Sequence, residues 1–248
     1  MIEDFFKKFD IREKDYILFT GNLTRLLYKL KGNARENLNI FLDIFLKQTR
    51  GGGLAIQSFN WDFCKGLSYD ILNSKSQTGA LANIALKRAE FKRTKHPIYS
   101  FMVANNFQKD LIKLDNKGAF DENSPFDFFY KNKAKMIIVD LPLQDSFTFV
   151  HYVEQCFKVS YRYNKSFTSF YIDEKGYKEL KTYDMFVRAN NVLTYIYPLE
   201  ELFLEKSVMK VVFFDEICIK IINLEKAYEV ISKDIKQNQG LSLHILKA

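Results

Sequence analysis

Four side chains between residues 145 and 154 have types and a spacing that suit proton transfer. Asp145, Thr148, His151 and Glu154 follow one another at every third position. On a helix, residues three apart lie on one slanting stripe, so these side chains share one side. A carboxylate beside an imidazole orients one ring nitrogen and raises the basicity of the other. The spacing therefore predicts a general-base dyad of His151 and Glu154.

Simpler interpretations of the same residues stay open. A His and a Glu three apart on a helix commonly form an exposed pair of little consequence. Asp145 stands where an N-cap belongs, and Asp is among the residues preferred at that position. If the segment is catalytic, the Thr148 hydroxyl is a candidate for stabilising an oxyanion.

A second group of polar residues is Arg93-Thr-Lys-His96-Pro97-Ile-Tyr-Ser100. Pro97 favours an extended conformation at His96, which indicates a fixed loop. Guanidinium and ammonium donors suit phosphate oxygens, so Arg93, Lys95 and His96 are candidates for an anion subsite, and we include Ser100 with them. A solvated basic loop explains the same composition.

Two further loops each precede a helical pattern. One contains Ser76, Thr78 and Gly79, and the other contains Gly21 and Asn22 after the first predicted strand. Backbone N–H groups at the start of a helix attract phosphate or carbonyl oxygens, so both loops are candidates for binding a cofactor. Capping alone also places Gly, Ser and Asn at such turns.

Strand and helix patterns alternate through residues 1–156, which is typical of an α/β core. Buried strands are expected at Asp15 to Thr20, Leu54 to Phe59, Tyr99 to Ala104 and Met136 to Leu141. Helices are expected at Ile2 to Phe9, Leu23 to Leu30, Asn33 to Gln48, Ala80 to Lys87, Phe126 to Tyr130 and Phe147 to Cys156. The candidate base follows a strand, and ligands of open α/β sheets gather beyond the carboxyl ends of the strands.

Residues 157–248 have a different pattern that predicts β-rich structure. Strands are expected within Phe157 to Phe170 and Val208 to Ile222, and helices near Leu199 to Glu205 and Leu224 to Ile235. No linker or repeat divides the chain. We therefore predict one domain over residues 1–248, in which a mostly parallel central sheet flanked by helices carries an antiparallel C-terminal part.

Composition narrows the class of protein. The chain is 47% hydrophobic and 16% aromatic, enough for a buried core. Its apolar runs are too short to span a membrane, and it opens with acidic residues rather than a secretory signal, so the cytoplasm is the expected location. Cys64, Cys156 and Cys218 lack metal-ligand or disulfide spacing, so we expect no metal and reduced core thiols. A homodimer is compatible with the sequence.

The net charge favours an anionic partner. Thirty-seven Lys and Arg residues against thirty Asp and Glu residues give +7. The basic residues are scattered and no nucleic-acid-binding motif is present, which argues against a nucleic-acid-binding protein. A non-catalytic basic module stays open as an alternative. A hydrolase with Cys64 or Cys156 as nucleophile is less favoured, because Cys156 lies about 140° around the helix from His151.

These motifs, in this order, resemble the aminoglycoside 3-N-acetyltransferase family, also called antibiotic N-acetyltransferases. Residues 93–100 are similar to the family's Arg-Ser-x-His-Pro-x-x-Ser, and residues 145–154 to its Asp-x-x-Thr-x-x-His-x-x-Glu. Ser76-x-x-Gly79-Ala-Leu is similar to Ser-x-x-Gly-Ala-Leu. Two departures concern the acyl or acceptor pocket: Thr20-Gly21-Asn22-Leu23 replaces His-Ser-Ser-Leu, and Asn83 replaces an acid.

The resemblance implies acetyl-coenzyme A, or another acyl-coenzyme A, as donor and an amine as acceptor. It also implies His151 as base with Glu154 behind it, and a fold distinct from GCN5-type acetyltransferases. Members of the family also act in surface-glycan pathways, on amino sugars carried by nucleotides. Because a basic protein repels polycations, we expect such an amino sugar as acceptor, with an aminoglycoside as the alternative.

Overall fold

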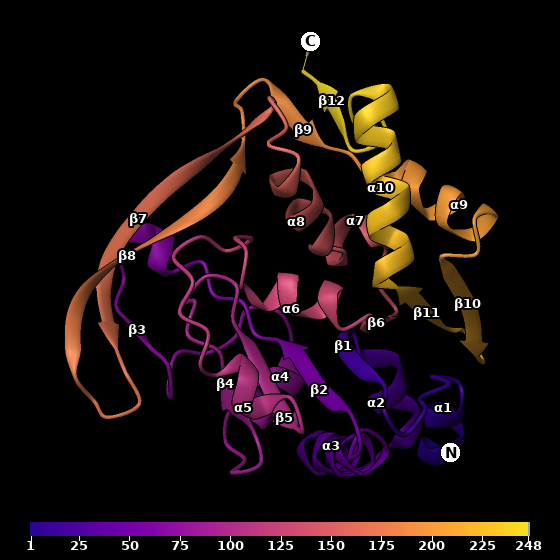
Figure 1. The fold of residues 1–248 in the computed structure, drawn as a ribbon. Coiled ribbons are helices and arrows are strands. Elements are labelled where there is room, and N and C mark those ends of the chain that lie inside the picture. Colours follow the sequence, from indigo (N-terminus) through magenta and orange to yellow (C-terminus); the bar gives the residue numbers. More distant parts are fainter. Residues whose placement is uncertain (248) are drawn as a thin grey trace.

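The computed structural model describes residues 1–247, and its centre is a seven-stranded sheet in the order β10-β11-β6-β1-β2-β5-β4 (Figure 1). The three central strands, β6 (Lys135–Val139), β1 (Tyr16–Gly21) and β2 (Gly53–Gln57), run parallel. Antiparallel strands extend both edges: β5 (Phe101–Asn105) and β4 (Lys92–Arg93) on one side, β11 (Ile217–Asn223) and β10 (Met209–Phe214) on the other. The predicted α/β fold is confirmed, and the predicted parallel arrangement is present in the three central strands of the sheet.

Side chains of the central strands enter a different hydrophobic cluster on each face of the sheet. On β1, Ile17 and Phe19 point to one cluster and Leu18 to the other, as the two-residue period of a strand requires. Strands that are buried on both faces are apolar throughout, and this explains the unbroken apolar runs of the sequence.

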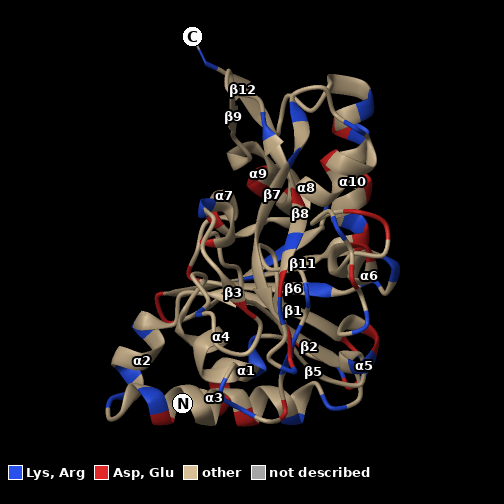
Figure 2. Ribbon diagram, turned by 90° about the vertical axis from the view of Figure 1, so that its left-hand side faces the viewer, with Lys and Arg blue, Asp and Glu red and all other residues tan. Residues whose placement is uncertain are grey.

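Helices cover both faces of the sheet. The Leu18 face carries α6 (Pro125–Lys131), α8 (Phe149–Cys156), α9 (Tyr197–Glu205) and α10 (Leu224–Asn238), together with the short helices α5 (Gln108–Leu111) and α7 (Leu143–Ser146). The Ile17 face carries α1 (Ile2–Lys7), α2 (Thr24–Leu30), α3 (Ala34–Gln48) and α4 (Ala80–Ala85). In Figures 1 and 2, α3 lies at the bottom and α10 at the top.

Local signals start several of these helices. The Asn33 side chain accepts hydrogen bonds from the first turn of α3, and the Ser124 side chain does the same for α6, followed by a proline at the first helical position. On α3 the buried residues Leu38, Phe41, Leu42 and Phe45 form the apolar face that their spacing predicts.

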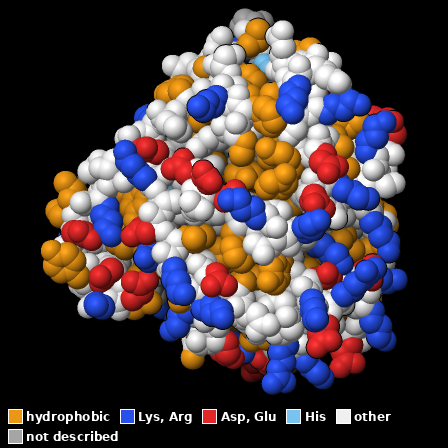
Figure 3. All heavy atoms as spheres, in the orientation of Figure 1, with side chains coloured by type: hydrophobic (Ala, Val, Ile, Leu, Met, Phe, Trp, Pro, Cys, Tyr) orange, Lys and Arg blue, Asp and Glu red, His pale blue; other side chains and the backbone are white. Residues whose placement is uncertain are grey.

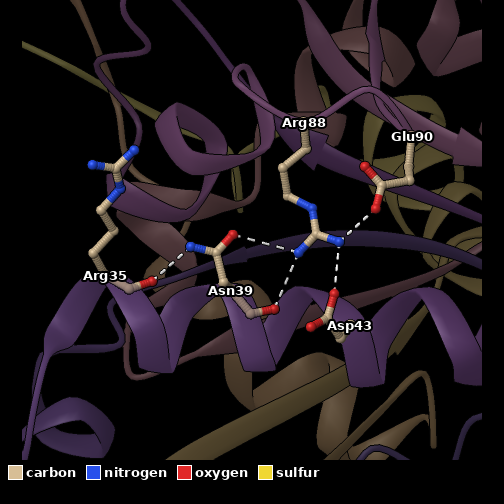
Figure 4. A network of polar contacts seen from close by, with 5 residues as sticks. All are labelled: Arg35, Asn39, Asp43, Arg88 and Glu90. Atoms are coloured by element: carbon tan, nitrogen blue, oxygen red, sulfur yellow. Dashed lines mark hydrogen bonds and ion pairs between the residues drawn. The ribbon is translucent and has the colours of Figure 1, made fainter.

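Arg88, directly after α4, ties that helix to α3. Its Nη2 lies 2.6 Å from carboxylate oxygens of both Asp43 and Glu90, and its Nη1 donates to the backbone carbonyl of Asn39 (Figure 4). The Arg88 side chain is largely buried, whereas the carboxylates of Asp43 and Glu90 are exposed. It holds α4, whose start lines the cavity described below.

The predicted helix from Phe147 to Cys156 begins later than expected, and Asp145 is not its N-cap. Asp145 lies inside the short helix α7, and the helical conformation is interrupted at Phe147. The next helix, α8, begins after Thr148, whose side chain makes no capping hydrogen bond. The break turns the Phe147 ring into the core, where it contacts Phe203. Burial of an aromatic ring thus outweighs one continuous helix.

Only part of the C-terminal third lies outside the central sheet, although the sequence predicts an appended antiparallel part. Its strands β10 and β11 complete the central sheet through pairing of β11 with β6. A long hairpin of β7 (Arg162–Ile172) and β8 (Lys178–Arg188) pairs instead with β3 (Tyr69–Asp70), and it curves along one side of the molecule in Figure 1. A small pair, β9 (Val192–Thr194) and β12 (His244–Leu246), and the 3-10 helix η1 (Phe63–Lys65) complete the fold.

Four global features bear on function. Within residues 1–247 no helix is long and apolar enough to cross a membrane, and no group of three or more His, Cys, Asp or Glu side chains could hold a metal ion. Basic and acidic side chains alternate over the face shown in Figure 3. The three cysteines are free thiols, but Cys156 is exposed and the other two are half-buried, so the expected core thiols are a wrong prediction.

Candidate active site

A cavity of about 450 Å³ lies where the three parallel strands end. Gly21 and Asn22 follow β1, Gln57 and Trp61 come from the end of β2 and beyond, and Asp145 follows β6. We call this the strand-end cavity. The carboxyl ends of parallel strands meet at one edge of a sheet, so this is the place where an α/β fold offers a ligand site.

Two loops contribute to the lining of the strand-end cavity. The Thr78 hydroxyl bonds to the carbonyl of Gln57, to the Ser76 hydroxyl and to the backbone N–H of Phe59, so it is used within the loop. Ser76 is buried and does not line the cavity. Gly79 has φ +119°, a conformation that favours glycine, and it starts α4 at the cavity wall.

Two helices begin at this cavity without side-chain caps. Leu23, before α2, and Gly79, before α4, have no side chain that could accept a hydrogen bond from the N–H groups of the first turn. Asn22 satisfies one group, the backbone N–H of Thr24, at 3.0 Å. The remaining N–H groups of both first turns are donors for a ligand oxygen, because such groups have no partner inside the helix.

The predicted contact between His151 and Glu154 is present. His151 Nδ1 lies 2.7 Å from Glu154 Oε2, and Arg162 Nε lies 2.7 Å from the same oxygen. The Arg162 contact is an ion pair rather than a well-aligned hydrogen bond. The Glu154 side chain is fully buried, whereas the His151 side chain keeps 18% of its surface exposed. The exposed pair considered as the simpler interpretation is therefore excluded.

The pKa directions of the pair suit a base. Burial lowers the pKa of His151 most, the Arg162 charge lowers it further, and Glu154 opposes both. Burial raises the pKa of Glu154, but His151 and Arg162 outweigh this and lower it overall. At neutral pH the carboxylate is ionised and accepts the Nδ1 proton, so Nε2 of the neutral imidazole carries a free lone pair.

A second cavity, of about 600 Å³, lies between His151 and the β7–β8 hairpin. We call it the hairpin cavity. Tyr99 lines the hairpin cavity and Trp61 lines the strand-end cavity. Phe59 packs edge-on against both rings. The base thus lies at the hairpin cavity, and Phe59 links the linings of the two cavities.

Comparison with known proteins identifies the family. The model of the aminoglycoside 3-N-acetyltransferase family matches residues 54–236, which is more than half of the chain. The chain belongs to this family. It is an N-acetyltransferase that transfers the acyl group of acetyl-coenzyme A to an amine, as the sequence resemblance implied. No curated protein matches the sequence.

Solved structures share the fold of this N-acetyltransferase. AAC-IIIb in a binary complex with CoASH has a TM-score of 0.81 at 11% identity, over 96% of this chain and 95% of that one. AAC-VIa with bound sisomicin gives 0.77 at 13%, over 96% and 97%. The YokD protein from Bacillus subtilis gives 0.77 at 16%, over 97% and 93%. At these identities the likeness establishes the fold.

The structure does not bring the expected anion subsite of this N-acetyltransferase to either cavity. The buried Arg93 guanidinium donates to the carbonyls of Ser58 and Ser74 and to the Ser100 hydroxyl. His96 is buried too: its Nδ1 accepts from the backbone N–H of Tyr99. Their polar groups are used within the protein, so these residues hold the loop in place, and the subsite prediction is corrected.

Sequence reasoning missed several residues of the N-acetyltransferase site. Arg162 lies on β7, eight positions after Glu154, and no spacing rule connects a helix with the next strand. Gln57 lies within the strand expected at Leu54 to Phe59, and Trp61 follows that strand in a segment for which the sequence predicts no helix or strand. Tyr99 belongs to a recognised motif but was assigned to a strand. For Trp61 the position after a parallel strand was the one available signal.

Proposed function

We propose that His151 is the general base of the acetyl transfer, oriented by Glu154. The observation that supports this most is the buried 2.7 Å contact that leaves Nε2 free at a cavity. An alkyl ammonium is not a nucleophile, so its proton must be removed close to the thioester carbonyl. A neutral imidazole with a lowered pKa is available for this proton at neutral pH.

The strand-end cavity is the proposed site of coenzyme A, with Gly21, Asn22, Thr78 and Gly79 at its wall. The uncapped N–H groups at the starts of α2 and α4 suit phosphate and carbonyl oxygens. Bound there, acetyl-coenzyme A supplies an activated acyl group. Ser76 supports the loop through its bonds to Thr78 and Asn83.

The hairpin cavity is the proposed entry of the acceptor amine. His151 Nε2 takes one proton from the ammonium, the amine nitrogen attacks the thioester carbon, and a tetrahedral oxyanion forms. The partly exposed Thr148 hydroxyl and nearby backbone N–H groups are the proposed oxyanion donors. The carbon–sulfur bond then breaks, and the departing thiolate takes up the second amine proton as the amide forms.

Two classes of acceptor amine are supported by different observations. The family and the sisomicin-bound structural neighbour favour an aminoglycoside. The net charge of +7 favours a nucleotide-linked amino sugar destined for a surface glycan. Both classes present an amine on a sugar ring, so the chemistry at His151 is the same.

Release of coenzyme A thiol tests this function directly. The protein is incubated with acetyl-coenzyme A and, separately, with a set of aminoglycosides and a set of nucleotide-linked amino sugars. Thiol release that depends on one of the two sets is the expected result and assigns the acceptor class. Release that no amine accelerates would contradict amine acetylation by this chain.

A further inference from the structure

We propose that the hairpin cavity binds an acceptor that carries a phosphate or diphosphate group, held by Lys165, Arg188 and Lys247. This inference rests on the proposed function, because it assumes that the acceptor amine reaches His151 from this side. It narrows the acceptor to an anionic amino sugar. The charges that line this cavity, and not the net charge of the chain, indicate such an acceptor.

Three cations of this cavity have no acidic partner. Lys165, Arg188 and Lys247 line it, and none of them lies within 4.0 Å of a carboxylate of residues 1–247. Lys165 and Arg188 are exposed side chains on facing strands of the hairpin, and Arg188 Nη1 also donates to the backbone carbonyl of Val192. The fourth cation, Arg162, is buried against Glu154 and also donates to Thr194 and Phe186, so it is not available to a ligand.

No Asp or Glu of the described residues lines the hairpin cavity. The nearest carboxylate with a defined role, Glu154, is fully buried and already paired with His151 and Arg162. A polycationic sugar carries several ammonium groups, and each would face cations here without a carboxylate to bind it. A phosphate group would instead accept charge-assisted hydrogen bonds from lysine and arginine.

The rest of the cavity wall suits the body of such an acceptor. Tyr163, Phe167, Met185 and Val187 from the hairpin line it, with His151 across from them. Lys165 lies over the Phe167 ring, 5.3 Å from its centre, so one cation is already placed beside an aromatic surface. Apolar and aromatic walls with a few charged groups are typical of small-molecule sites. The arrangement offers contacts for a sugar or base and separate contacts for its phosphates.

Binding of uridine diphosphate to the protein saturated with coenzyme A tests the subsite without catalysis. Saturation occupies the coenzyme A site, so further binding reports a second anion site. We expect uridine diphosphate to bind, and Lys165→Glu or Arg188→Glu to weaken its affinity about tenfold or more, the effect of losing a charge-assisted hydrogen bond. Lys109→Glu, on α5 away from both cavities, makes the same change in net charge and should leave the affinity unchanged.

Kinetics with a matched pair of acceptors completes the test. Glucosamine and glucosamine 6-phosphate share one amine and differ by one phosphate. We expect a higher kcat/KM for the phosphorylated sugar, and we expect Lys165→Glu to abolish that preference while the KM for acetyl-coenzyme A stays unchanged.

Three results would overturn the subsite. The first is that uridine diphosphate does not bind to the protein saturated with coenzyme A. The second is that Lys109→Glu weakens the affinity for uridine diphosphate as much as Lys165→Glu does. The third is that Lys165→Glu raises the KM for acetyl-coenzyme A and changes nothing else. Failure of the proposed function is a separate result: it appears as undiminished acetyl transfer by His151→Ala, which leaves uridine diphosphate binding intact.

Discussion

At the scale of single residues, the proposed chemistry rests on three side chains in mutual contact. Glu154 orients His151, and Arg162 from the neighbouring strand holds Glu154 ionised. The contact between His151 and Glu154 could be predicted, because three positions along a helix determine which side chains meet. The contribution of Arg162 could not, because it depends on how β7 packs against α8.

Replacing Arg162 tests this arrangement through pH. The Arg162 charge lowers the pKa of His151, so Arg162→Gln should raise that pKa. A base must be unprotonated, so the acid limb of kcat/KM should move to higher pH in Arg162→Gln. Arg162→Lys, which keeps the charge, should move it less. If the acid limb lies at the same pH in the unchanged protein and in both variants, Arg162 has only a structural role.

At the scale of elements, the buried His96 makes the stability of the loop after β4 depend on pH. Burial lowers the pKa of His96 from 6.5 to about 4. An unfolded histidine binds its proton first, so this contribution is complete above pH 6.5 and is lost as the pH falls to about 4. The shift corresponds to roughly 3 kcal/mol of unfolding free energy.

Urea unfolding at pH 7 and pH 4 measures this effect. In His96→Asn the difference in unfolding free energy between the two pH values should shrink by roughly 3 kcal/mol, although the variant is less stable at pH 7. His151 and the carboxylates supply the dependence that remains. A pH dependence equal to that of the unchanged protein would contradict the assignment.

The end of β1 is too close to β6 for any side chain at Gly21. A Cβ there would lie 2.8 Å from the Val139 Cβ and 3.0 Å from its carbonyl oxygen. Gly21→Ala should therefore push the two strands apart, destabilise the protein by about 1–3 kcal/mol and raise the KM for acetyl-coenzyme A. Urea unfolding and initial rates check this. An unchanged KM would separate this turn from the coenzyme A site.

Most elements could be predicted from periodicity, because a helix or strand that is buried on one face has the same spacing of apolar residues in any topology. Strand direction could not. β5 runs antiparallel to β2, and nothing in its apolar run distinguishes this from the expected parallel arrangement. The break at Phe147 was missed because it depends on a contact with Phe203, more than fifty residues away in the chain.

At the scale of the whole molecule, the ends of three parallel strands line one cavity and a distant hairpin lines another, and Phe59 packs against Trp61 of the first and Tyr99 of the second. The donor and the acceptor therefore have separate proposed approaches. The net charge indicated an anionic ligand, but it did not reveal that the unpaired cations of this site gather at the hairpin cavity.

Replacing His151 tests the central claim most directly. In His151→Ala, with normal folding and an unchanged affinity for coenzyme A, we predict that kcat for thiol release falls by about 10² to 10⁴, the usual contribution of a general base. A loss of less than about fivefold in the same variant would contradict the assignment of His151 as the base.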